Sequence, residues 1–106
     1  MPWIYLLIAG VMEWGWPIGL KFAAMPQHRW WAIQLAIVSI VLSGIFLFLA
    51  QRTIPIGTAY AVWTGIGAVG TLILGIVLLD EPAAFARFFF VGLIVIGIAG
   101  LKLSSP

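Results

Sequence analysis

Apolar residues along the chain fall into four long runs that short polar segments separate. A helix that spans the hydrocarbon core of a bilayer needs about 20 mostly apolar residues, and each run is long enough. The pattern predicts helices over 3–22, 30–50, 56–79 and 84–103. Because the connections are short, consecutive helices are expected to be antiparallel neighbours. We therefore expect an all-α membrane protein whose residues 1–106 form a single four-helix transmembrane domain.

The composition places this chain outside the soluble classes of protein. Hydrophobic residues make up 64% of it and charged residues only 8%, whereas a soluble domain carries about 25% charged residues. The absence of cysteine and the single histidine argue against a metal site, and no cofactor is expected. No basic patch suggests nucleic acid. No nucleophile–base pair or phosphate-binding loop is present, so an enzyme is not expected.

The basic residues are nearly balanced between the two membrane faces that four spans would define. Arg52 and Lys102 fall on the face that holds both termini, while Lys21, Arg29 and Arg87 fall on the other. The positive-inside rule needs a clear bias to select one orientation. We therefore expect insertion in both orientations, with a fixed orientation set by other factors as the alternative.

Glycines at helical spacing indicate close packing between helices. They are Gly15 and Gly19 in the first predicted helix and Gly92, Gly97 and Gly100 in the fourth. Such residues let helix backbones approach closely in lipid, although the pattern does not identify the partner. Because four helices are too few to enclose a solute pathway comfortably, we expect a homodimer.

Glu13 is the one acidic residue within a predicted span, and it lies near the middle of that span. A charge at the bilayer centre costs several kcal/mol even on conservative scales, and such residues usually mark proton or ion sites. An acid there can exchange a proton for a cation, as a proton-coupled antiporter requires. The alternative is a permanently protonated side chain that only makes a hydrogen bond between helices.

Helical spacing assigns different roles to the residues around Glu13. Trp16 and Pro17 share its face, and the Trp16 ring could stack on a bound cation, with simple packing as the alternative. Trp14 points about 100° away, which favours a packing role. Pro17 has no N–H to donate to the carbonyl of residue 13, so a bend is expected at the acid.

Two further helices offer polar groups to the same site. One face of the third predicted helix carries Tyr60, Trp63, Thr64 and Gly67. Gly65 and Gly67 weaken the middle of that helix and would permit a hinge, unless they serve only close packing. In the second predicted helix, Ser39 and Ser43 lie four residues apart, and either hydroxyl could bond to the Glu13 side chain.

Taken together, these features resemble the small multidrug resistance family over essentially the whole chain. The resemblance is carried by the length, the four helices, the single acid in the first helix, PIGTAYAVWTGIG in the third, and GIAGLK near the end. It implies an antiparallel, dual-topology homodimer in the bacterial inner membrane. Its partners would be a small cationic substrate, protons and the lipid bilayer.

Within this family the chain looks like the branch that exports guanidinium. Trp16 matches the tryptophan of that branch, and the other matching positions are Glu13, Ser43, Tyr60 and Trp63. The resemblance implies a proton-coupled antiporter that exports guanidinium or small substituted guanidinium cations, such as guanylurea, by alternating access. Protons and substrate would compete for the two Glu13 carboxylates of a dimer.

Two alternatives to guanidinium export remain open at this stage. One is a multidrug exporter of quaternary ammonium and other hydrophobic cations, and the other is a non-transporting membrane assembly subunit. Trp14 and Pro17 depart from the usual pattern of the guanidinium branch, where smaller residues are more common. A bent helix and altered packing at these positions put the substrate range in question.

Overall fold

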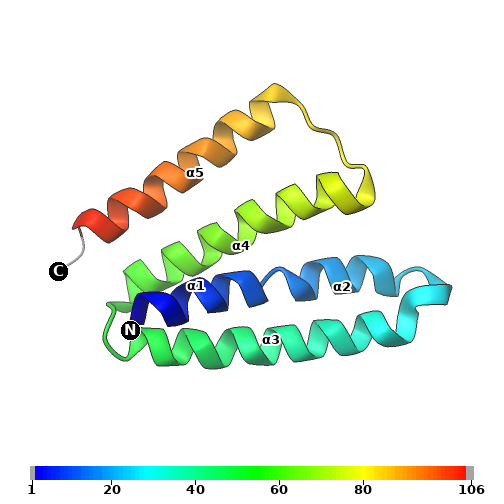
Figure 1. The fold of residues 1–106 in the computed structure, drawn as a ribbon, viewed down its shortest axis with the longest axis horizontal. Helices are drawn as coiled ribbons and strands as arrows, with labels where there is room; N and C mark the ends of the chain where they lie inside the picture. The colour runs from blue at the N-terminus through cyan, green and yellow to red at the C-terminus, as the bar shows by residue number, and fades with distance from the viewer. Residues whose placement is uncertain (1, 105–106) are drawn as a thin grey trace.

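The computed structural model describes residues 2–104, and its regular secondary structure is entirely helical (Figure 1). The elements are α1 (Pro2–Met12), α2 (Gly15–Ala23), the 3₁₀ helix η1 (Pro26–His28), α3 (Arg29–Gln51), α4 (Ile56–Leu79) and α5 (Phe85–Ser104). Four helical segments are long and apolar enough to cross a membrane: Pro2–Ala23, Pro26–Gln51, Ile56–Leu79 and Phe85–Ser104. The prediction of an all-helical chain with four such spans is confirmed. Residues 1, 105 and 106 of the expected domain lie outside the described part.

The first span, predicted as one helix over 3–22 with a bend at the acid, is divided at Glu13 and Trp14 into α1 and α2. The Trp14 N–H donates to the Val11 carbonyl, three residues back, at 3.1 Å. Pro17 has no N–H for the Glu13 carbonyl. The two halves still run in line beside α3 (Figure 1). The span therefore keeps its direction but is interrupted at its acidic residue.

The helices lie in the order α3, α1 with α2, α4 and α5 across the molecule (Figure 1). Five buried residues form the apolar core where α1, the end of α3 and the start of α4 meet: Leu6, Ala50, Ile54, Ala59 and Val62. Helix α5 has no buried residue. It packs mainly against α4, and its Lys102 Nζ lies 5.2 Å from the centre of the Trp3 ring of α1.

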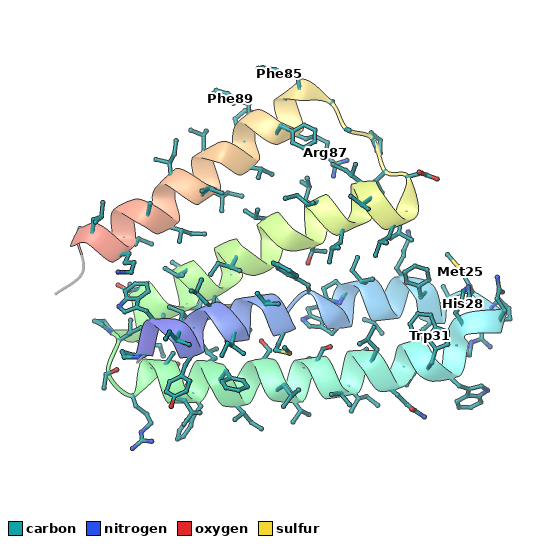
Figure 2. All side chains as sticks on the ribbon, viewed as in Figure 1. Met25, His28, Trp31, Phe85, Arg87 and Phe89 are labelled. Carbon is teal, nitrogen blue, oxygen red and sulfur yellow. The ribbon has the colours of Figure 1, made fainter. Side chains whose placement is uncertain are left out.

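The α2–α3 and α4–α5 connections lie at the end of the bundle away from both termini, where Figure 2 labels His28, Trp31 and Arg87. Between α2 and α3, the Trp31 Nε1 donates to His28 Nδ1 at 3.3 Å, and both rings pack against Phe22. After α4, Asp80 adopts a left-handed conformation with φ of 53° and ends the helix. The Arg87 Nη1 donates to the Pro82 carbonyl at 2.7 Å, which fixes the start of α5.

Candidate functional site

Glu13 lies at the break between α1 and α2, where the partly buried side chain faces α3 and α4. The Glu13 N–H still bonds to the Ala9 carbonyl at 3.0 Å, so the last turn of α1 reaches the acid. Beyond it, the helical bonding resumes with the Ile18 N–H donating to the Trp14 carbonyl at 3.4 Å. The carboxyl group is thus held at the junction of two half-helices, a place where membrane transporters often bind ions.

Ser43 of α3 connects Glu13 to α4 through a buried hydroxyl. The Trp63 Nε1 donates to Ser43 Oγ at 2.8 Å. Ser43 Oγ in turn lies 2.9 Å from the Ala9 carbonyl oxygen and 3.3 Å from Glu13 Oε1. The structure therefore brings together three of the residues expected at the site, one from each of three spans.

The Ser43 hydroxyl can respond to the protonation of Glu13. A serine hydroxyl has one hydrogen to donate and two lone pairs that accept. When Glu13 is protonated, its carboxyl can donate to Ser43 while Ser43 donates to Ala9. When Glu13 is ionised, the same hydroxyl can turn and donate to the carboxylate instead. Rotation of the hydroxyl alone would therefore let Ser43 pair with either form of the acid.

A hollow of about 400 Å³ opens beside this network, and Glu13, Trp16, Tyr60 and Trp63 line it together with Thr64. The Tyr60 and Trp63 rings lie 5.2 Å apart between centroids and form one wall. Within residues 2–104, the Trp16 Nε1 is buried without a hydrogen-bond partner. The hollow thus combines one acid with three aromatic rings, a lining suited to a flat organic cation.

The three residues expected as secondary lining take different positions. Thr64 lines the hollow, and its Oγ1 donates to the Tyr60 carbonyl at 2.6 Å. Pro17 lines a second hollow on the other side of Glu13. Ser39 is buried against Gly15, where its side chain occupies the space that a Cβ would need. Of the two α3 serines, only Ser43 is bonded to the acid.

The glycines named from the sequence have several distinct packing partners. Gly19 lies against Ala32 and Ala36 of α3, and Gly65 lies against Ile98 of α5. Helix α4 runs without a break through Gly65 and Gly67. A Cβ on Gly67 would lie only 2.9 Å from Glu13 Cγ, so this glycine makes room for the acid.

The glycines of α5 have no neighbour of this kind. A Cβ placed on Gly92, Gly97 or Gly100 would meet no atom within 4 Å among the described residues. Their close-packing role therefore remains a prediction, because no other part of residues 2–104 packs against them.

The sequence interpretation did not identify the contact that Trp14 makes. The Trp14 Nε1 donates to the Ile66 carbonyl of α4 at 2.9 Å, and its ring lies directly over Gly70. The packing role expected for Trp14 agrees with this contact. Gly67 and Gly70, three residues apart, were the available signal, since they place two small residues on the face of α4 toward the first span.

The fold and the site define a small polytopic membrane protein with one acid and several aromatic rings around a cation-sized hollow. The chain matches the family described as Small Multidrug Resistance protein over residues 1–94, and it belongs to that family. Members of this family handle small cations in a membrane. This membership confirms the resemblance drawn from the sequence.

Among similar proteins, the guanidinium exporter of Yersinia pestis is 52% identical over 108 aligned residues, covering 99% of this chain and 100% of the relative. The guanidinium exporters of Citrobacter freundii and Salmonella typhimurium are each 53% identical, and the alignments cover 99% of both chains. Together with the four apolar spans, these relatives identify a multi-pass transport protein of the bacterial inner membrane.

Proposed function

We propose that this chain exports guanidinium and small substituted guanidinium cations, such as guanylurea, in exchange for protons. The observation that carries the proposal is the Glu13 carboxyl group, which is bonded to Ser43 and opens onto an aromatic-walled hollow. Guanidinium is planar and weakly hydrated, and its N–H groups match a carboxylate in a bidentate geometry. The relatives named guanidinium exporters support the same substrate.

Substrate and protons would compete for the same acid. In this mechanism the cation forms paired hydrogen bonds with Glu13 while its flat face stacks on Trp16 and the Tyr60–Trp63 wall. Ser43 then donates to the ionised carboxylate. Protonation of Glu13 removes the negative charge and releases the cation, while the Ser43 hydroxyl returns to the Ala9 carbonyl.

We further propose that the working unit is an antiparallel homodimer with a Glu13 from each subunit at its centre. Tyr60 is 58% exposed although it lines the hollow, so one side of the site is open in a single chain. Helix α5 also leaves its apolar surface uncovered. The near-balance of basic residues between the two faces supports dual topology. In such a dimer, the inward-open and outward-open states can be one structure with the subunits exchanged.

The aromatic lining also supports a second candidate function, the export of quaternary ammonium and other hydrophobic cations. A quaternary ammonium has no N–H group, so it would leave the paired acceptor oxygens of Glu13 without a hydrogen bond. The hydrogen-bonding side of the site therefore favours guanidinium.

Transport currents from purified protein in liposomes on a solid-supported membrane would test the proposal. Guanidinium and guanylurea should drive currents, and tetraalkylammonium should drive much less. Glu13→Gln should abolish binding and proton-coupled transport, whereas Asp80→Asn, a matched change at an exposed carboxyl in the last connection, should leave them intact. Proton-driven uptake by Glu13→Gln would contradict the mechanism, and a tetraalkylammonium current that exceeds the guanidinium current would contradict the substrate.

A further inference from the structure

A second hollow, of about 260 Å³, lies beside Glu13 and is lined by α2 and α4. Glu13, Trp16 and Thr64 line both hollows, so the two spaces meet at the acid. The first hollow extends toward Tyr60 and Trp63, near the start of α4. The second extends the other way along α4, and no part of the proposed guanidinium exchange uses it.

The floor of the second hollow is a stripe of small and polar residues on α4. Thr64, Ala68 and Thr71 follow one another at intervals of four and three residues, and Gly67 lies beside them. None of these side chains is large, so the space next to Glu13 stays open. Pro17 of α2 forms part of the opposite wall.

Polar groups at this hollow are available to a ligand. The Thr64 hydroxyl is already bonded to the Tyr60 carbonyl at 2.6 Å. The Thr71 hydroxyl, in contrast, makes no hydrogen bond within residues 2–104, although a threonine in a helix commonly bonds to its own main chain. Pro17 also leaves the Glu13 carbonyl without its usual helical donor. Thr71 therefore lines this space from α4, and Glu13 lines it from the first span.

We infer that this second hollow binds a polar substituent on the guanidinium group, with the Thr71 hydroxyl as its hydrogen-bond partner. The inference rests on the proposed function, because Glu13 must hold the charged end of the same molecule. A carbamoyl group, as in guanylurea, is planar and offers both a carbonyl acceptor and N–H donors. It could therefore bond to Thr71 and to the Glu13 carbonyl. An alkyl substituent of similar size has nothing to bond to either group.

The test compares three substrates in the same current measurement: guanidinium, guanylurea and propylguanidinium. Thr71→Val keeps the shape of the side chain but removes its hydroxyl. It should raise the KM of guanylurea about three- to tenfold, the usual effect of losing one hydrogen bond, and leave the other two substrates unchanged. Thr71→Ser keeps the hydroxyl, so the KM of guanylurea should stay near the wild-type value. Thr58→Val, near the start of α4 and away from the hollow, is the matched control.

A second variant, Ala68→Leu, places a larger side chain on α4 that fills the second hollow. It should block guanylurea while guanidinium still drives a current. An equal change in KM for all three substrates, or no change with Thr71→Val, would overturn the inference, as would a wild-type protein that transports guanidinium but not guanylurea. Failure of wild-type protein to transport guanidinium would instead overturn the proposed function.

Discussion

The indole N–H of Trp14 donates to the main-chain carbonyl of Ile66 at 2.9 Å, and this bond fastens the break in the first span to the middle of α4. The ring fits because Gly70, one turn further along α4, has no side chain beneath it. Glu13 lies over Gly67 in the same way. The two residues of the break, Glu13 and Trp14, therefore each pack against a glycine of α4.

Trp14→Phe keeps an aromatic ring over Gly70 but removes the N–H. The loss of one hydrogen bond should raise the KM of guanidinium by about three- to tenfold, because the acid is held less firmly. Gly70→Ala should have the larger effect, since the new methyl group displaces the ring itself. Substrate-driven currents measure the KM, and thermal unfolding in detergent checks that the fold survives. An unchanged KM in both variants would show that Glu13 is positioned without Trp14.

Ser43→Ala removes the acceptor of the Trp63 indole and the hydroxyl that contacts Glu13. A buried donor without a partner costs about 1–3 kcal/mol, so guanidinium affinity should fall by an order of magnitude or more. Ser39→Ala, one turn away on the same helix, should leave affinity unchanged because Ser39 is outside the network. Equal effects of the two variants in a binding titration would argue against the hydroxyl network.

Competition between protons and substrate sets the sign of the pH dependence. Because protons and guanidinium compete for one site in the proposed mechanism, the apparent KM of guanidinium should rise as the pH falls. At high pH, where protons no longer compete, the KM should become independent of pH. Equilibrium binding measured over a range of pH values checks this relation. A guanidinium affinity that stays constant or improves on acidification would contradict competition at Glu13.

Gly67→Ala places a methyl group against the Glu13 side chain, where a Cβ would lie 2.9 Å from Cγ. The acid must then shift away from Ser43, and small displacements of a reacting group are costly. Transport should fall by about an order of magnitude while unfolding changes little, because alanine favours a helix over glycine. Gly57→Ala in the same helix meets no atom of residues 2–104 within 4 Å and is the matched control. Equal transport by both variants would show that Gly67 is not needed for space.

Much of the architecture could be predicted because every helix that crosses a bilayer needs about 20 mostly apolar residues to match the thickness of the hydrocarbon core. The grouping of Glu13 with residues of two other helices also followed from helical periodicity. Spacing alone could not choose between Ser39 and Ser43, since they lie on the same face one turn apart. The family resemblance singles out Ser43, and the packing of α3 against α1 gives the physical reason, because it brings the Ser43 hydroxyl to Ala9 and Glu13.

Other parts of the site depend on contacts between helices that carry little sequence signal. The missing N–H of Pro17 predicts a bend at the acid, and the structure divides the first span at Glu13 and Trp14. The second hollow was missed because Ala68 and Thr71 are ordinary residues for a membrane helix. They become part of a site only because the small residues beside them leave space next to the acid.

Helix α5 contributes no residue to either hollow beside Glu13, and none of its residues is buried. The residues of the proposed cation site therefore lie on the first three spans, apart from the exposed surface of the last span. Gene duplication could exploit this separation. A copy that changes only the exposed face of α5 would alter the surface available to a partner subunit and keep the proposed cation site, so subunit pairing and substrate range could evolve at different rates.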